Sequence, residues 1–149
     1  MAIVQIFDVK QNKVVIVDKV QKPDAEWKKE LQPKVFEITT RRGTERPGTC
    51  AFEEVHGPGL FRCIRCGTDL FRAATKFESG TGWPSFYEPV SKLNVVEQPD
   101  LSLGMVRTEV LCARCGSHLG HVFDDGPPPT GKRYCMNGFA LKFVPEKEL

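Results

Sequence analysis

The chain has 149 residues, with 21 basic and 19 acidic side chains and a net charge of +2. This length suits one domain with a sizeable core. The nearly balanced charge gives no electrostatic footprint for nucleic acid or for an anionic membrane surface, and no apolar run is long enough to cross a bilayer. We therefore expect no nucleic-acid partner and no membrane partner.

The N-terminal residues 1–8 are apolar, but they contain Asp8 and lack the cationic start and small-residue cleavage site of a signal peptide. We expect a cytoplasmic protein. In that reducing compartment, the six cysteines favour metal binding or redox chemistry over disulfides. A secreted disulfide framework is the alternative.

Residues 3–8 and 13–18 are rich in β-branched side chains and predict a hairpin. We assign no chemical role to this hairpin. The two structural alternatives are an added edge of a sheet and a dimer contact. We therefore divide the chain into a β-rich extension over residues 1–22 and a domain over 23–149.

A short helix is predicted over residues 24–31, with Asp24 as its N-cap and Pro33 as its stop. Alternation of apolar and polar side chains over 35–40 predicts a strand. The glycines and the proline of 41–49 predict an irregular segment.

From residue 59 onward the signals are mostly β, with tight turns between short runs, which favours antiparallel sheets. The predicted strands cover residues 60–63, 105–111 and 133–144. Alternation in the last strand would place Cys135 and Asn137 side by side on one face, ahead of an apolar row of Phe139, Leu141 and Phe143.

Two Cys-x-x-Cys pairs, each followed by a glycine, predict a structural zinc site. They are Cys63-Ile64-Arg65-Cys66-Gly67 and Cys112-Ala113-Arg114-Cys115-Gly116. A tight turn aims both sulfurs at one ion, the glycine supplies the positive φ of such a turn, and four thiolates leave zinc no open position for catalysis. A second ligand set, Cys112 and Cys115 with His118 and His121, would leave the first pair unused.

Cys135 lies outside the metal pairs, a short distance after His118 and His121. A lone cysteine with histidine and asparagine nearby has the composition of a nucleophile site, and a histidine or Arg133 beside the sulfur would favour the thiolate. A buried inert cysteine is the alternative reading. Trp83 stands in a rigid turn, either in the core or in the wall of a small pocket.

Several longer runs closely resemble the B-type methionine sulfoxide reductases, which act on the R epimer of methionine sulfoxide. The runs are Ser79 to Phe86, Arg107 to Val110, His118 to Gly126 and Arg133 to Asn137, and Gly43 to Pro47 resembles an N-terminal element of the family. The similarity covers roughly residues 27–145 and leaves residues 1–20 outside it.

The resemblance implies two antiparallel β-sheets with short N-terminal helices and a zinc ion on four cysteines. It implies that Cys135 is the catalytic cysteine, that Trp83 packs on the substrate methyl group, and that His118, His121 and Asn137 surround the sulfoxide. Thr44 and Arg133 stand at matching motif positions and are taken as substrate-binding residues.

The sequence departs from the family at two positions. Many members have a resolving cysteine where this chain has Thr81, and a serine where it has Gly138. The second change would cost a hydrogen bond near the site. Of the six cysteines, only Cys50 is then left as the resolving candidate, and an unused loop thiol is its other reading.

The predicted reaction is attack of the Cys135 thiolate on the sulfoxide, which yields methionine and a sulfenic acid. Cys50 or an external thiol then reduces that acid, and a thioredoxin-like protein recycles the enzyme. The predicted substrate is free methionine sulfoxide or the residue in oxidised proteins. The competing hypothesis is a non-enzymatic zinc module, which would explain the four paired cysteines but not Cys135 beside two histidines.

Overall fold

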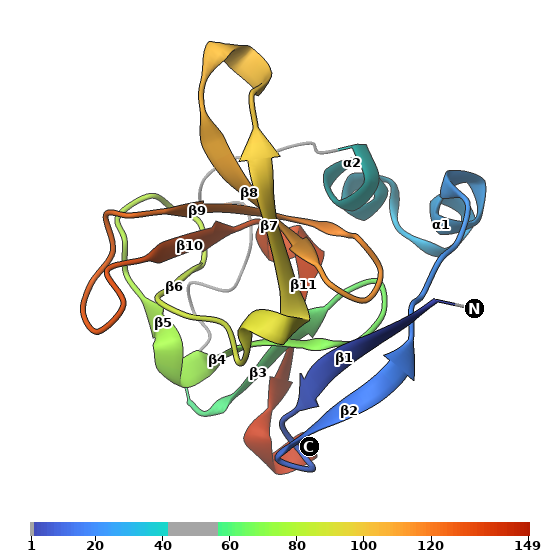
Figure 1. Cartoon of the computed structure of the whole chain (residues 1–149), viewed down its shortest axis with the longest axis horizontal. Coiled ribbons are helices and arrows are strands. Elements are labelled where there is room, and N and C mark those ends of the chain that lie inside the picture. The colour runs from blue at the N-terminus through green and yellow to red at the C-terminus, as the bar shows by residue number, and fades with distance from the viewer. Residues whose placement is uncertain (1, 42–56) are drawn as a thin grey trace.

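The computed structural model describes residues 2–41 and 57–149, which form two α-helices and eleven β-strands (Figure 1). The elements are β1 Ile3–Asp8, β2 Lys13–Asp18, α1 Asp24–Glu30, α2 Pro33–Arg41, β3 Gly59–Cys63, β4 Asp69–Arg72, β5 Lys76–Phe77, β6 Ser85–Phe86, β7 Val95–Asp100, β8 Arg107–Cys112, β9 His118–Phe123, β10 Arg133–Met136 and β11 Leu141–Pro145. The predictions for Thr44 and Cys50 fall outside the described residues.

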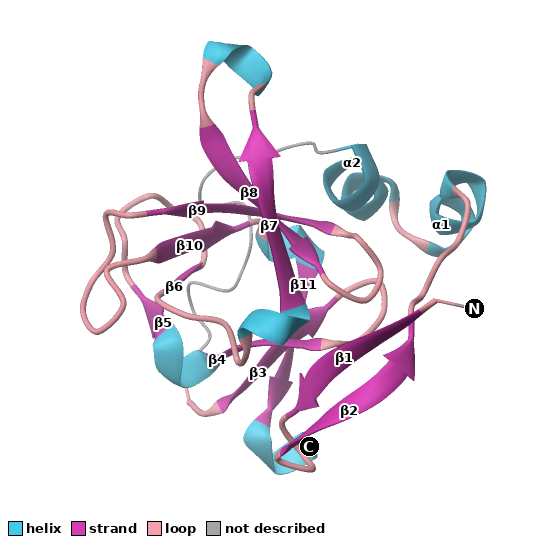
Figure 2. Ribbon diagram, in the orientation of Figure 1, coloured by secondary structure: helices cyan, strands magenta, loops and turns pink. Residues whose placement is uncertain are grey.

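Two antiparallel sheets form the body of the fold. One has six strands in the order β5-β6-β10-β9-β8-β7, and the other has three in the order β11-β3-β4 (Figure 2). Aromatic side chains fill the space between them: Phe71 of β4 stacks on Phe86 of β6 with ring centroids 4.4 Å apart, and Phe61 of β3 meets Phe86 edge-on at 5.0 Å. The predicted mainly β fold is confirmed.

The predicted hairpin forms from β1 and β2 as a separate two-stranded sheet. It is fastened to the body by Asn94, which is fully buried, accepts from Phe7 N at 2.8 Å and donates to Phe7 O at 3.0 Å. Val20 N also donates to the carbonyl of Arg114 at 3.0 Å. The extension therefore rests on the second cysteine turn; the division at residue 22 stays a prediction.

Helix α1 covers most of the predicted range, but its N-cap is Pro23, and Asp24 is its first helical residue. Trp27 is the buried residue of α1, and the guanidinium of Arg65 lies 4.1 Å from its ring centroid. The helix thus packs on the first cysteine turn. No helix within residues 2–41 and 57–149 is long and apolar enough to cross a membrane.

The strand predicted over residues 35–40 is wrong, because these residues belong to helix α2. Pro33 opens this helix in addition to following α1, since its fixed φ suits a first helical turn. The buried side chains sit at helical spacing, at positions 35, 36, 38 and 39. In so short a run, that pattern also resembles strand alternation.

The single strand predicted over residues 133–144 is also wrong. Strand β10 ends at Met136, a 3-10 helix spans Gly138–Ala140, and β11 then joins the other sheet. Asn137 starts the turn: its backbone N–H donates to Leu119 O at 2.8 Å and its carbonyl accepts from Ala140 N at 3.0 Å. Cys135 and Asn137 therefore stay at the six-stranded sheet, while the predicted apolar row passes to the other sheet.

Candidate active site and metal centre

The four paired cysteines converge at one point, with all four sulfurs within 4.8 Å of one another. Cys63 Sγ lies 3.5 Å from Cys115 Sγ, and Cys66 Sγ lies 3.6 Å from Cys112 Sγ. Zinc bound at about 2.3 Å by a tetrahedron of sulfurs requires Sγ–Sγ separations of about 3.8 Å. The cluster is therefore positioned to bind a metal of that size.

The local geometry of the two turns agrees with the sequence. Gly67 has φ +79° and Gly116 has φ +76°, the positive values predicted for the residue after each second cysteine. Hydrogen bonding among the sulfurs raises the pKa of Cys63 well above its usual range and lowers the pKa of Cys66. The pKa of Cys112 is lowered and that of Cys115 is raised in the same way, so two of the four sulfurs favour the thiolate, and a bound cation would favour the deprotonated form of all four.

The alternative ligand set with two histidines is wrong. His118 Nδ1 lies 2.7 Å from Glu109 Oε2, and His121 Nε2 lies 2.7 Å from Asp100 Oδ2. Both imidazoles are thus held by carboxylates, away from the cysteine cluster.

The register of the six-stranded sheet aligns the site. Cross-strand partners run from β7 to β6 in one row: Gln98 opposite Glu109, Glu109 opposite His121, His121 opposite Cys135, and Cys135 opposite Ser85. Directly opposed residues share a face of a sheet. Residues 14 to 50 positions from Cys135 in the sequence therefore lie in one row with it.

Gly120 makes this alignment possible. A Cβ atom at position 120 would lie 2.2 Å from the backbone oxygen of Cys135. Only glycine therefore lets β9 approach β10 this closely between the two histidines.

A pocket of about 260 Å³ opens in front of Cys135. Its walls include five of the predicted site residues and five further ones: Cys135, His121, Asn137, Trp83 and Arg133, with Thr81, Arg107, Gly120, Phe123 and Met136. The second histidine, His118, is only 4% exposed and lies behind His121, with ring centroids 5.6 Å apart. Trp83 was expected either in the core or in the wall of a small pocket, and in the structure it lines the pocket wall.

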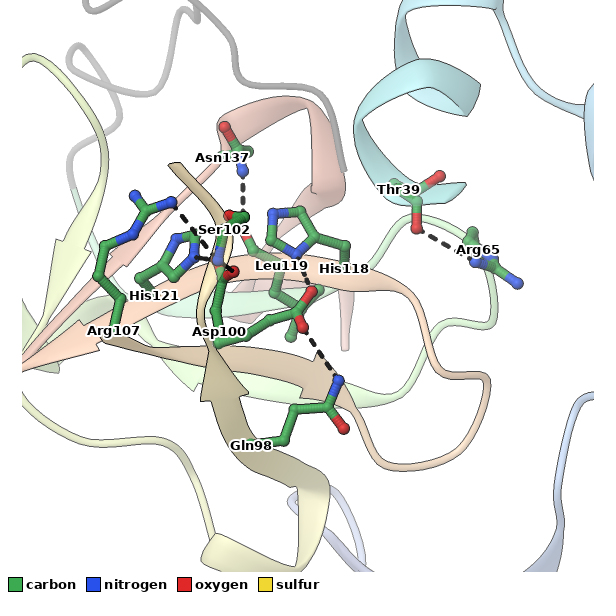
Figure 3. A network of polar contacts seen from close by, with 11 residues as sticks. Thr39, Arg65, Gln98, Asp100, Ser102, Arg107, His118, Leu119, His121 and Asn137 are labelled. Atoms are coloured by element: carbon green, nitrogen blue, oxygen red, sulfur yellow. Dashed lines mark hydrogen bonds and ion pairs between the residues drawn. The ribbon is translucent and has the colours of Figure 1, made fainter. Parts of the chain in front are cut away.

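Asp100 orients His121 from the end of β7 (Figure 3). The same carboxylate accepts from Arg107 Nη2 at 3.4 Å and, through its other oxygen, from Ser102 N at 3.0 Å. Hydrogen bonds from Ser102 and from His121 hold the pKa of Asp100 well below its usual range. The ionised acid then fixes the ring that faces the pocket.

Glu109 holds the His118 ring as Asp100 holds the His121 ring. Its side chain is 1% exposed, accepts from His118 Nδ1, and also accepts from Gln98 Nε2 at 3.0 Å. A buried carboxyl group is tolerated where hydrogen bonds satisfy it. His118 therefore supports the site from behind.

Cys135 is half-buried at the pocket floor. Burial raises the pKa of its thiol, while the Thr81 hydroxyl, 3.9 Å from Sγ, and the nearby Arg133 guanidinium lower it. The predicted influence of Arg133 is thus in the right direction, but burial outweighs it. The net shift of the Cys135 pKa is therefore upward, opposite to the lowering expected from Arg133 alone.

Arg133 and Asn137 complete the rim. Arg133 donates to both carboxylate oxygens of Asp125, at 2.9 and 3.2 Å, and lies 4.3 Å from the ring centroid of Phe123. Asn137 is 5% exposed, and its Nδ2 donates to Leu119 O at 3.2 Å. Both side chains are thus fixed beside Cys135.

Sequence reasoning missed three side chains around the pocket: Asp100, Glu109, and Thr81 as a neighbour of Cys135. Glu109 stands inside the Arg107 to Val110 run that carried part of the resemblance, so a signal for it was present. Asp100 carries no local motif, and only the register of β7 on β8 shows that it reaches His121.

Comparison with known proteins identifies the family of the chain. A family model described as the SelR domain matches residues 31–145. Three similar proteins bear the name peptide methionine sulfoxide reductase MsrB. The one from Thiobacillus denitrificans is 54% identical, and the match covers 84% of this chain and 95% of that protein. The one from Leptospira interrogans is 53% identical, with 85% and 97% covered, and the one from Pseudomonas syringae is 51% identical, with 87% and 98% covered.

A solved structure, the Yippee-like domain of Mis18, is 19% identical, with a TM-score of 0.47 over 58% of this chain and 95% of its own; that likeness is too low to bear on function. The family match and the reductases carry the assignment: with half of its residues identical to theirs over nearly their full length, the chain belongs to the SelR-domain family of MsrB methionine sulfoxide reductases.

Proposed function

We propose that this reductase acts on methionine-(R)-sulfoxide and that Cys135 is its nucleophile. The observation that carries the proposal is the row in which Cys135 lies directly opposite His121 on the adjacent strand, at the floor of a small pocket. A thiol, an imidazole and an apolar wall are the three parts that sulfoxide reduction needs.

The Cys135 sulfur attacks the sulfur of the sulfoxide. The sulfur–oxygen bond of the substrate breaks, and the sulfoxide oxygen, with a proton, ends on the Cys135 sulfur. Methionine leaves as the thioether, and Cys135 becomes a sulfenic acid. Because sulfoxide is a poor electrophile, the oxygen needs a proton or strong hydrogen bonds. His121, oriented by Asp100, and Asn137 supply these, and His118 stabilises the arrangement from behind.

Trp83 and Phe123 provide the apolar walls for the substrate methyl group, while Arg133 borders the opening. Thr44 lies outside the described residues, and its role as a substrate contact rests on the motif alone. The four-cysteine site holds zinc, since sulfur ligands at this spacing are its preferred set, and a closed set of four makes the ion structural.

Epimer selectivity tests the function. The purified chain is mixed with thioredoxin, thioredoxin reductase and NADPH. This coupled system should consume NADPH when the R sulfoxide is added, and at least about a hundredfold more slowly when the S sulfoxide is added. The pocket walls and the polar groups occupy fixed positions around Cys135, so only one epimer can point its oxygen at His121 while its methyl group meets Trp83. Equal rates, or a preference for S, would contradict the assignment.

The sulfenic acid must then be reduced, and we propose Cys50 as the resolving thiol. Thr81 rather than a cysteine lies beside Cys135, and the other four cysteines belong to the metal cluster. Attack of the Cys50 thiol on the sulfenic sulfur releases water and forms a disulfide, which a thioredoxin-like dithiol reduces. A reaction that consumes thiols at each turnover suits the reducing cytoplasm.

Mass spectrometry after one turnover without reductant tests Cys50. The wild-type chain should contain a Cys50–Cys135 disulfide and react poorly with dimedone, which traps sulfenic acids. The Cys50→Ser chain should release one equivalent of methionine yet keep a dimedone-reactive Cys135. Persistent sulfenic acid in the wild type would remove Cys50 from the scheme and leave an external thiol to reduce Cys135.

The competing hypothesis of a non-enzymatic zinc module is wrong, because the chain belongs to a family of reductases. Such a module would also not require a pocket lined by a thiol and a carboxylate-held histidine. Alkylation gives a direct check on the site: the reagent should modify Cys135, and prior incubation with methionine sulfoxide should prevent that modification.

A further inference from the structure

The tip of the β7–β8 hairpin, residues 101–106, exposes three large apolar side chains among those that the structure describes. Leu101 is 69% exposed, Met105 45% and Val106 87%. Among the described residues, few other large apolar side chains are as exposed, and the tip projects beyond the rest of the fold at the top of Figure 1. Within residues 2–41 and 57–149, no packing contact accounts for this concentration of apolar surface.

The tip is built and oriented by the same residues that form the pocket. Asp100, which holds His121, precedes it, and Arg107, which lines the pocket, follows it. The Asp100 carboxylate also accepts from Ser102 N, which anchors the 3-10 helix Ser102–Gly104 at the end of the hairpin. The apolar surface therefore begins where the polar wall of the pocket ends.

We propose that this tip is a docking surface for the polypeptide that flanks a methionine sulfoxide in an oxidised protein. The proposal rests on the proposed function and adds to it the place where a protein substrate is held. A pocket of about 260 Å³ accommodates little more than one side chain, so the flanking residues must lie outside it.

The chemistry of the substrate favours an apolar surface of this kind. Methionine is usually buried, so its neighbours in an unfolded or loosened segment include apolar side chains. Oxidation turns its thioether into a polar group that disrupts the core and exposes those neighbours. The tip contains no charged residue between positions 101 and 106, and Met105 adds a flexible side chain that adapts to varied partners.

The test compares two substrates on one variant. The full chain carrying Leu101→Ser, Met105→Ser and Val106→Ser should lose about tenfold in kcat/KM for peroxide-oxidised casein, an unfolded protein, mainly through KM. Its kcat/KM for free methionine-(R)-sulfoxide should stay unchanged, which also shows that the variant folds and that the proposed function holds.

The N-terminal hairpin offers a matched control. Ile3, Val14 and Ile16 are 61%, 49% and 63% exposed, and their triple replacement by serine should leave both substrates unaffected. An equal loss on both substrates, or none on either, would overturn the proposal. A changed sedimentation coefficient would assign the tip to a second copy of the chain, and a rise confined to the KM for thioredoxin would assign it to the reductant; either result would also overturn it.

Discussion

Replacing Cys135 by serine should abolish sulfoxide reduction while leaving metal content and fold intact. A serine hydroxyl is far less acidic than a thiol and does not take up the substrate oxygen as a sulfenic acid, so the rate should fall by about a thousandfold or more. Methionine release from the R sulfoxide under dithiothreitol measures the activity, and elemental analysis measures the metal.

The position of Cys135 explains why the loss should be confined to chemistry. Its side chain points into the pocket, while its neighbours in β10, Tyr134 and Met136, are buried in the core. Serine is smaller than cysteine and needs no repacking there. The matched control is Cys50→Ser, which should still yield methionine when dithiothreitol is present. Retained reduction in the Cys135→Ser chain would refute the assignment of the nucleophile.

The metal site was predictable because its information is local. Each pair is encoded within five consecutive residues, and the glycine after it fixes the turn without help from the rest of the chain. The row through Cys135 is different, because it depends on which strands pair and in what register. Sequence motifs named Cys135 and His121, but only the β9–β10 pairing shows that they face each other.

The errors follow the same division between local and long-range information. Helix α2 contains apolar side chains whose spacing fits a strand as well as a helix, and packing against the sheet decided between them. Residues 133–144 alternate throughout, but the hydrogen bond from Asn137 N to Leu119 O and the 3-10 helix after it break the run. Asp100 was missed because it lies 21 positions from His121 in the sequence and carries no local motif.

Removing the metal should destabilise the whole fold rather than the cysteine turns alone. Cys63 ends strand β3 of the three-stranded sheet, and Cys112 ends strand β8 of the six-stranded sheet, so an ion held by the four cysteines would join the two sheets. Other elements also contact both cysteine turns: Arg65 lies over the Trp27 ring of α1, and the Arg114 carbonyl accepts a hydrogen bond from Val20 N. A structural zinc site contributes its binding energy to folding.

We therefore expect the Tm, followed by circular dichroism, to fall by more than about 10 °C after the metal is stripped with a chelator under reducing conditions. Cys112→Ser should cause a similar fall, whereas Cys135→Ser should cause little, although both replace one cysteine in the same domain. Elemental analysis of the untreated chain identifies the ion. An unchanged Tm in the metal-free chain would mean that the aromatic core holds the sheets together by itself, and the cysteine cluster would then need another explanation.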